Sequence, residues 1–318
     1  MKKNILITGV NGQVGTKLFD FLNQLSGYKI ISSDIGENRY NFPNYKNLDV
    51  TDRKSITNVI KRYEINEIYH LAAILSSTGE QNNQLAWEVN MNGLMNVLSA
   101  ARDCKVSRLF YPSSIAVFGG PFPNGIAHQN LLSTPTTMYG INKLAGENLC
   151  NYFSMKFGLD IRSLRYPGII GPENNAGGGT TDYAVEIFHD AVERGSYRCF
   201  LSEHTILPMI YIDDAIRATL EIMKADESKI KIKTSYNLAG FSFSPFQLSQ
   251  EIKNIIPNFK ISYYTDHRQA IADSWPQKIN DDAAKNDWGW QPKFGIREMT
   301  STIIDSITLN NYTNSNSA

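Results

Sequence analysis

The first 25 residues contain the feature that most restricts the fold of this chain. Residues 4–8 form a short apolar run that predicts a β-strand, and residues 17–25 have the spacing of a helix. Between them lie Gly9, Gly12 and Gly15. A strand, a glycine-rich turn and a helix in this order present backbone N–H groups to a pyrophosphate and let the helix pack closely on the strand. The segment predicts a dinucleotide site at the start of a parallel sheet.

A second predicted strand, at residues 28–33, leads into Asp34, which lies nineteen residues beyond Gly15. An acidic residue at this distance accepts hydrogen bonds from both hydroxyls of the adenosine ribose and repels a 2′-phosphate. The position therefore favours NAD over NADP, although an aspartate that only shapes a turn is the alternative interpretation. Residues 48–52 close a third predicted strand and begin a helix, and Asp49 in this segment is a candidate to face the adenine amino group.

Strand and helix patterns alternate along the next part of the chain. Apolar runs at residues 67–73, 107–114 and 160–165 are separated by helical patterns at 84–103 and 144–157. This alternation predicts an α/β, Rossmann-like doubly wound parallel sheet with right-handed crossovers. We expect an NAD-binding domain at residues 1–171, to which residues 207–240 return. A smaller C-terminal α/β substrate-binding lobe is expected at residues 172–310, and a flexible tail at the polar residues 311–318.

A candidate catalytic group follows the fifth predicted strand. Ser113 and Ser114 end this strand, and Tyr139 and Lys143 lie four residues apart in a helical segment, so they share one face. A lysine ammonium lowers the pKa of a neighbouring phenol, and a serine hydroxyl can bond to a reacting oxygen, so the group suits oxidation of a secondary alcohol. An exposed Tyr–Lys pair without chemistry is the structural alternative. His70 is expected to be a buried strand histidine rather than a catalyst.

Charge and cysteine content exclude several classes of function. The chain has 318 residues with 31 basic and 31 acidic side chains, and so lacks the basic surface that nucleic acid or an anionic membrane requires. No stretch is apolar enough for a bilayer span. Cys104, Cys150 and Cys199 lack metal-ligand spacing, which predicts reduced thiols in a cytoplasmic protein without a metal site. A small-molecule substrate is the expected ligand.

Candidate substrate contacts lie in three loops. The loop at residues 174–182 is rich in glycine and threonine and precedes a helical pattern, whose free N–H groups would suit a carboxylate. Gly178, Thr180 and Thr181 are the candidates there, although glycines also punctuate ordinary loops. Ser76 is a further candidate from the loop after the fourth strand. Trp275 is either a pocket residue or a packing residue of the small lobe.

Together these motifs resemble the extended short-chain dehydrogenase/reductase family over nearly the whole chain. The matching motifs are Gly9-x-x-Gly12-x-x-Gly15, Asp34, Asp49-Val50, Leu71-Ala72-Ala73, Asn90-x-x-Gly93, Ser113-Ser114, Tyr139-x-x-x-Lys143, Tyr166-Pro167-Gly168 and Tyr211-Ile212-Asp213-Asp214. Within this family, residues 75–80, 168–172, 177–184, 207–211 and 273–276 are similar to the NAD-dependent L-threonine 3-dehydrogenases of short-chain type.

The resemblance implies oxidation of the 3-hydroxyl of L-threonine to 2-amino-3-oxobutyrate, with NAD as hydride acceptor and no metal. It assigns Tyr139 as the base, Lys143 as its activator and the holder of the nicotinamide ribose, and Ser114 rather than Ser113 as the group that orients the alcohol. The expected NAD contacts are Gly9, Asn11, Gly12, Gln13, Val14, Gly15, Asp34, Ile35, Leu48, Asp49, Val50, Leu71, Ala72, Ala73, Asn90, Tyr139, Lys143, Tyr166, Pro167, Gly168 and Ile169. The expected substrate contacts are Ser76, Ser114, Tyr139, Gly178, Thr180, Thr181 and Trp275. The family likeness also implies a homodimer packed through residues 84–103 and 140–157.

Two other functions would use much of the same machinery. UDP-sugar 4-epimerases and dehydratases of this family share the cofactor site and the base, but they need cationic side chains for two phosphates. After residue 171, Arg194, Arg198 and Arg217 form no clear cluster. A catalytically silent NAD-binding protein would have no need of the serine, tyrosine and lysine at these spacings.

Overall fold

The computed structural model describes residues 2–120, 122–173 and 179–315. A seven-stranded parallel sheet with the order β11-β7-β5-β4-β1-β2-β3 forms its centre. The strands are β1 (Lys3–Thr8), β2 (Tyr28–Asp34), β3 (Lys46–Asn47), β4 (Glu67–His70), β5 (Arg108–Ser114), β7 (Asp160–Tyr166) and β11 (Tyr236–Asn237). The chain winds outward in both directions from the β1–β4 pair, so the predicted doubly wound, Rossmann-like fold is confirmed.

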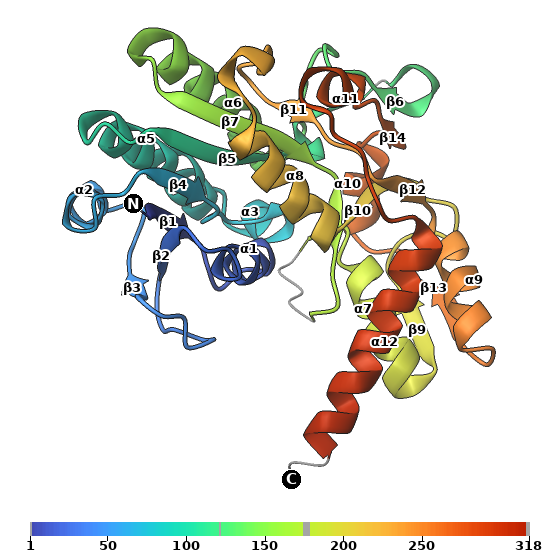
Figure 1. The fold of residues 1–318 in the computed structure, drawn as a ribbon. Coiled ribbons are helices and arrows are strands. Elements are labelled where there is room, and N and C mark those ends of the chain that lie inside the picture. The colour runs from blue at the N-terminus through green and yellow to red at the C-terminus, as the bar shows by residue number, and fades with distance from the viewer. Residues whose placement is uncertain (1, 121, 174–178, 316–318) are drawn as a thin grey trace.

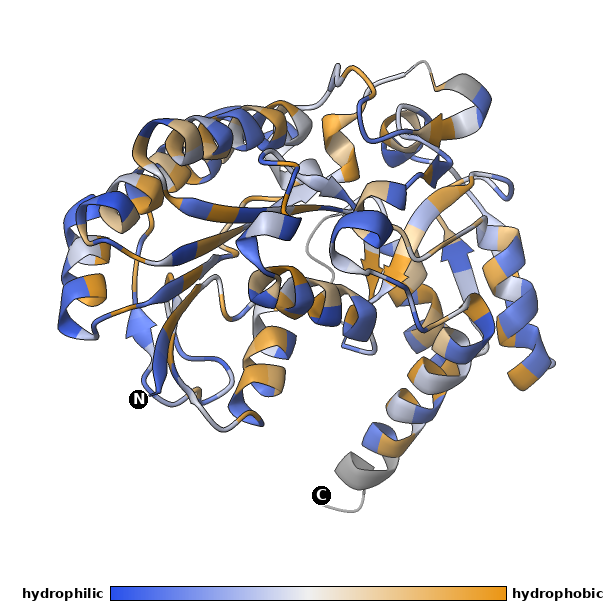
Figure 2. Ribbon diagram, turned by 45° about the horizontal axis from the view of Figure 1, so that its top comes forward, coloured by the Kyte–Doolittle hydropathy of each residue, from blue (hydrophilic) through white to orange (hydrophobic). Residues whose placement is uncertain are grey.

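Helices cover both faces of this sheet (Figure 1). One face carries α1 (Gln13–Asn23) and α8 (Ile212–Lys224), and the other carries α2 (Arg53–Arg62), α5 (Gly93–Asp103) and α6 (Met138–Phe157). Side chains of β1 alternate between the two layers, because successive residues of a strand point to opposite faces. Leu6 packs in the cluster that contains Leu94 of α5, whereas Ile7 packs in the cluster that contains Leu18 of α1. Hydrophobic and hydrophilic residues both occur on each of these helices (Figure 2), as two-sided packing requires.

A smaller lobe follows the large sheet. Its three-stranded sheet has the order β12-β10-β8, in which β10 runs parallel to β8 and antiparallel to β12. Two parallel two-stranded ladders, β13–β9 and β14–β6, complete the strand pairing. The strands are β6 (Ile126–Ala127), β8 (Gly168–Ile170), β9 (Ser196–Cys199), β10 (Leu207–Tyr211), β12 (Phe241–Phe243), β13 (Lys260–Tyr263) and β14 (Lys278–Ile279). The helices are α7 (Tyr183–Arg194), α9 (Pro245–Ile255), α10 (Arg268–Asp273), α11 (Asp282–Trp288) and α12 (Ile296–Ser315). In the ranges described above, no helix has the length and apolar character to cross a membrane.

The segment predicted as one helix at residues 84–103 is divided. It consists of α4 (Asn83–Trp87), a π-helical turn (Glu88–Asn92) and α5, and α3 (Ser76–Gln81) precedes it. Asn90 lies inside the π-helical turn and bonds through its side chain to both backbone groups of Ile74, at 2.8 and 3.0 Å. A local change of helical pitch is a common way to direct one side chain out of a regular ladder.

Other boundaries also differ from those expected. β3 ends at Asn47, just before residues 48–52, where the third strand was expected to close. β10 belongs to the small sheet, so the chain returns to the large sheet only with α8 and β11. The final helix, α12, continues to Ser315. The helix therefore includes residues 311–315 of the predicted tail, and residues 316–318 lie outside the described part.

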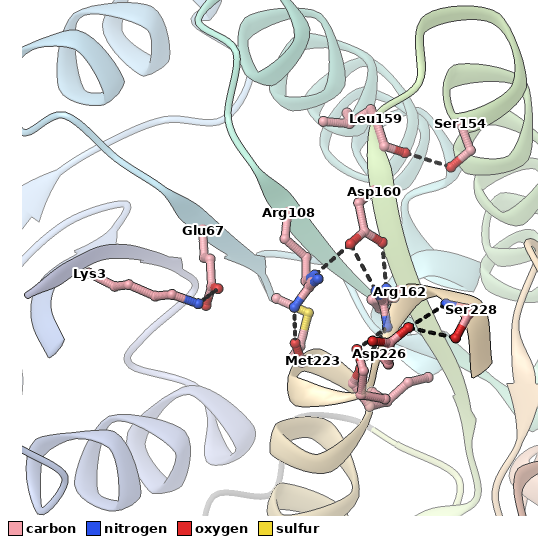
Figure 3. A network of polar contacts seen from close by, with 12 residues as sticks. Lys3, Glu67, Arg108, Ser154, Leu159, Asp160, Arg162, Met223, Asp226 and Ser228 are labelled. Carbon is pink, nitrogen blue, oxygen red and sulfur yellow. Dashed lines mark hydrogen bonds and ion pairs between the residues drawn. The ribbon is translucent and has the colours of Figure 1, made fainter. Parts of the chain in front are cut away.

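The buried Arg162 and the partly exposed Arg108 attach the end of α8 to the amino edge of the sheet (Figure 3). Asp160 accepts hydrogen bonds from Arg108 Nε at 2.6 Å and from Arg162 Nε at 2.5 Å. Arg162 also donates to the Ile222 carbonyl at 3.0 Å, and Arg108 donates to that of Met223. Terminal carbonyls of a helix lack partners inside the helix, so these guanidinium groups cap α8. The opposite, carboxyl edge of the sheet carries the candidate site.

Candidate active site

The glycine loop has the geometry that a dinucleotide needs. Gly9 has a positive φ of +73°, and a Cβ added there would lie 2.6 Å from Ala72 N. A Cβ on Gly15 would lie 2.3 Å from Gly9 O, so both positions exclude a side chain. Gly12 caps α1 without a side-chain hydrogen bond, which leaves the first N–H groups of the helix open to a ligand. These groups fit a pyrophosphate.

Asp34 is fixed at the end of β2. Its Oδ2 accepts a hydrogen bond from Asn11 N at 2.8 Å, and its Oδ1 accepts one from Ile35 N at 2.8 Å. Each carboxylate oxygen keeps a further lone pair, so the group can still accept bonds from two ribose hydroxyls. The orientation of Asp34 by the glycine loop itself supports the predicted preference for NAD.

A cavity of about 270 Å³ lies at the carboxyl edge of the large sheet. Most of the predicted contacts line it, namely Gly9, Gly12, Gln13, Val14, Gly15, Leu71, Ala73, Ser76, Ser114, Tyr139, Lys143, Tyr166, Pro167, Gly168, Ile169, Thr180, Thr181 and Trp275. Leu75, Pro112, Ser113, Ile115, Gly179 and Asp182 also line it and were not predicted as contacts. The predicted residues that lie outside the lining are Asn11, Asp34, Ile35, Leu48, Asp49, Val50, Ala72 and Asn90. Gly178 lies outside the described residues.

Several of the predicted residues outside the lining make structural contacts within the protein. Asp49 Oδ1 accepts from Thr51 N and Thr51 Oγ1, both at 2.8 Å. Val50 packs under α5, where a Cβ on Gly93 would approach Val50 Cγ2 to 2.8 Å. Asn90 is buried, and besides Ile74 it bonds to Asn142 Oδ1 at 3.3 Å. Asn90 therefore holds the segment that leads into α3, which begins at Ser76.

Three consecutive residues of β5 contact α6 at the centre of the cavity. Thr137 caps α6 by accepting from Gly140 N at 3.1 Å, which places Tyr139 and Lys143 in the first two turns. Lys143 Nζ donates to Pro112 O at 2.7 Å, and the Ser114 side chain lies beside Tyr139, whose pKa it lowers. Ser113 turns the other way and donates to Glu147 Oε1 at 2.5 Å. Ser114 is thus the serine beside Tyr139.

Burial dominates the acid–base properties of this pair. It raises the pKa of Tyr139 to about 12, while the hydrogen bond with Ser114 acts in the opposite direction. Burial also lowers the pKa of Lys143 to about 8, against the raising effects of Cys150 and Glu147. Lys143 Nζ lies 5.4 Å from the centroid of the Tyr139 ring and gives its hydrogen bond to a carbonyl. The expectation that this ammonium sets a low pKa for Tyr139 is therefore wrong for the protein alone, because desolvation of the phenolate is the larger effect.

The segment before α7 and the residue Trp275 also line the cavity, the first with polar side chains and the second with an aromatic ring. Thr180 is buried, and its hydroxyl has no hydrogen-bond partner within the described ranges. Thr181 and Asp182 follow it at the start of α7, where Asp182 Oδ2 accepts from Gly179 N at 2.9 Å. Trp275 lines the cavity and also belongs to the hydrophobic core, so the two alternatives for this residue hold together.

Other titratable groups near the site have structural roles. His70 is buried, and its Nδ1 lies 2.9 Å from Thr8 Oγ1. Burial, with a smaller contribution from Lys143, lowers the pKa of His70 to about 3, so the ring stays neutral. Cys104, Cys150 and Cys199 are free thiols. No group of three His, Cys, Asp or Glu side chains in the described part of the chain could hold a metal ion.

Comparisons with known proteins agree with this geometry. Residues 5–239 match the NAD dependent epimerase/dehydratase family. An uncharacterized epimerase/dehydratase of Staphylococcus haemolyticus is 42% identical over 311 residues, which are 96% of this chain and 98% of that protein. The GalE-like L-threonine dehydrogenase of Cupriavidus necator, solved in a holo form, is 45% identical with a TM-score of 0.93, over 96% of this chain and 99% of that one. A monomeric L-threonine 3-dehydrogenase from a metagenome gives the same four values. The chain therefore belongs to the NAD dependent epimerase/dehydratase family, and its cofactor is NAD.

Proposed function

We propose that this protein oxidises the 3-hydroxyl of L-threonine to 2-amino-3-oxobutyrate. The observation that carries the proposal is the meeting of Ser114, Tyr139 and Lys143 with the glycine loop and Thr180 in one cavity. Solved relatives at 45% identity are described as L-threonine dehydrogenases, which supports the choice of substrate. An amino acid with a secondary alcohol needs a proton acceptor, a carboxylate site and an ammonium site, and the cavity offers groups for each.

In the proposed reaction, Tyr139 accepts the proton of the substrate hydroxyl, and Ser114 holds the same oxygen by a hydrogen bond. NAD, when bound, accepts the hydride from the carbon that carries this oxygen. Lys143 holds the nicotinamide ribose and supplies positive charge beside the phenolate. The C–O single bond becomes a carbonyl, so one proton and one hydride leave the substrate.

The substrate groups have candidate partners on the far side of the cavity. The Thr180 hydroxyl lacks a partner among the described residues, and with Thr181 it suits the substrate carboxylate. Ser76, at the first turn of α3, is the second candidate for this anion. The Asp182 carboxylate is suited to the ammonium. Trp275 covers the apolar side, and Gly178 stays a predicted contact.

The charge of the cavity favours an amino acid over a UDP-sugar. Of the lining residues that the structure describes, Lys143 alone is basic. The three arginines considered for a diphosphate have other contacts. Arg217 bonds Asp214 at 2.7 Å and Glu221 at 2.8 Å, Arg194 pairs with Asp190, and Arg198 lies over Tyr264.

The test is NADH formation by the purified protein. The absorbance of NADH is followed with NAD plus L-threonine, and in parallel with UDP-glucose or UDP-galactose. We expect NADH formation only with L-threonine. A protein that is inert with threonine but interconverts the two UDP-sugars would be an epimerase, and one that binds NAD and acts on none of them would be a silent binding protein.

We further propose that two chains associate through α4, α5 and α6. Large apolar side chains are exposed on these helices, including Trp87 at 46%, Tyr152 at 49% and Met155 at 72%. Exposed patches of this kind mark protein interfaces. Sedimentation analysis should give a dimer that Met155→Glu converts to a monomer. A monomeric unsubstituted chain, like the metagenome relative, would contradict the proposal.

A further inference from the structure

Glu147 is a buried carboxylate that the proposed chemistry does not use. It lies on α6, four residues after Lys143, and only 1% of its side chain is exposed. Arg165 of β7 donates to both of its oxygens, at 2.8 Å each, and Ser113 donates to Oε1. Ser113 and Arg165 are paired residues of the β5–β7 ladder, so both strands contact the helix through this one carboxylate.

The ion pair is fully satisfied on its other side. Arg165 Nη1 donates to Gln129 O and to Asn237 Oδ1, each at 3.2 Å. Asn237 in turn donates to Ala127 O at 3.3 Å. A buried pair of this kind contributes little net stability compared with apolar side chains, but loss of one partner leaves an uncompensated charge. Because Glu147 lies on the same helix as the cavity residues Tyr139 and Lys143, the pair can have a role at the site in addition to stability.

Position along α6 gives that role. Tyr139, Lys143 and Glu147 recur every four residues and lie on one face of the helix. Each contacts one of three consecutive residues of β5, which are Ser114, Pro112 and Ser113 respectively. The Glu147 contact joins the helix to both strands at once, through Ser113 of β5 and Arg165 of β7, so it fixes the height and the rotation of the helix against the sheet.

Glu147 also acts on Lys143 through its charge. Burial lowers the pKa of Lys143, whereas Cys150 and Glu147 raise it. The other titratable groups around Lys143 are Tyr111 of β5, whose ring centroid is 5.0 Å from Nζ, His70 of β4 and Tyr139 of α6, while Arg165 of β7 pairs with Glu147 itself. Among these groups, Glu147 is the carboxylate.

We propose that Glu147 is a positioning residue of the oxidation site, which holds Tyr139 and Lys143 in register with β5 and supplies the negative charge that faces Lys143. The roles of Tyr139 and Lys143 in this inference rest on the proposed function. Glu147 does not line the cavity, so it acts through Lys143.

The experiment measures dissociation constants for NAD and NADH across a pH series, without threonine. The oxidised nicotinamide is a cation, so loss of the Lys143 proton should strengthen NAD binding relative to NADH. In the unsubstituted protein the dissociation constant for NAD should change with pH around a midpoint near the pKa of about 8 that Lys143 has in the free protein, and the constant for NADH should change less. Glu147→Gln should move this midpoint down by about one unit, and Arg165→Gln should move it up.

Asp160→Asn is the matched control. Asp160 of β7 is also a carboxylate that pairs with arginines, namely Arg108 and Arg162, but it lies at the amino edge of the sheet, opposite the cavity (Figure 3). The substitution should lower the melting temperature without moving the midpoint. Glu147→Asp keeps the charge and should restore the midpoint. If Glu147→Gln does not fold, the double variant Glu147→Gln/Arg165→Gln removes both charges of the pair. The midpoint of its binding curve should still lie at a lower pH than that of the unsubstituted protein.

Identical midpoints in all folded variants, with losses only in melting temperature, would reduce Glu147 to a structural residue and overturn the inference. The binding measurements contain no threonine, so they test this inference separately from the proposed function. A protein whose midpoint falls with Glu147→Gln and rises with Arg165→Gln, but which does not oxidise threonine, would contradict the proposed function alone.

Discussion

The pH dependence of threonine oxidation tests the Tyr139–Lys143 pair. The pKa values of about 12 for Tyr139 and about 8 for Lys143 differ by about four units, or about 5 kcal/mol. The first proton therefore leaves Lys143. The main singly deprotonated form thus has a neutral Tyr139 and a neutral Lys143. The reactive form, with a Tyr139 phenolate and a Lys143 ammonium, contains the same number of protons and is a minor tautomer of it. Both forms share one pH dependence.

It follows that kcat/KM for threonine should rise about tenfold per pH unit below the Lys143 pKa of about 8 and level off above it. Lys143→Met keeps the length of the side chain but cannot titrate. In this variant the proton must leave Tyr139 itself, so kcat/KM should continue to rise beyond that point, with a value at the wild-type midpoint lower by a factor of about 10²–10⁴.

The assay is the initial rate of NADH formation at saturating NAD over the pH series, in buffers of constant ionic strength. NAD binding, measured on each variant, separates loss of cofactor from loss of chemistry. A Lys143→Met profile that levels off at the wild-type position would refute the assignment of the titration to this pair.

Three further changes test separate parts of the structure. Asp34→Ala should weaken NAD binding by a factor of roughly 10–100 and improve NADP use, as measured by coenzyme titration; unchanged NADP use would show that Asp34 does not reach the ribose. His70 has a pKa of about 3 in the fold against 6.5 for the free side chain, so its stabilisation is complete above 6.5 and is lost as pH falls. At pH ~5 the loss is about 2 kcal/mol, and urea unfolding of His70→Gln should lack this part of the acid sensitivity. Thr180→Val removes a hydroxyl without a partner among the described residues, so the melting temperature should not fall, while KM for threonine should rise about tenfold; an unchanged KM would remove Thr180 from the substrate site.

The sequence predicted those parts of the fold that depend on local pattern. The glycine turn, the alternation of strands and helices and the four-residue spacing of Tyr139 and Lys143 are all visible along the chain, and they place the chemistry at one edge of the sheet. The predicted fold class is confirmed by the strand order and by the solved relatives.

The remaining features depend on which elements become neighbours. Adjacent strand residues point to opposite faces, so the sequence could not decide between Ser113 and Ser114 until the position of α6 was known. Asn90 was predicted to contact NAD, but its amide bonds to the backbone of Ile74. The pairing of Glu147 with Arg165 follows from the packing of α6 on β7, which no periodicity indicates.

The most direct test of the central proposal compares the unsubstituted protein with Tyr139→Phe in NAD binding and in NADH formation from L-threonine. Tyr264→Phe, which removes the hydroxyl of an exposed tyrosine outside the cavity lining, is the matched control. We predict normal NAD affinity in all three proteins, full turnover in Tyr264→Phe, and turnover reduced by a factor of about 10³ or more in Tyr139→Phe. Near-normal kcat in Tyr139→Phe, or an unsubstituted protein that forms no NADH from threonine, would contradict the account.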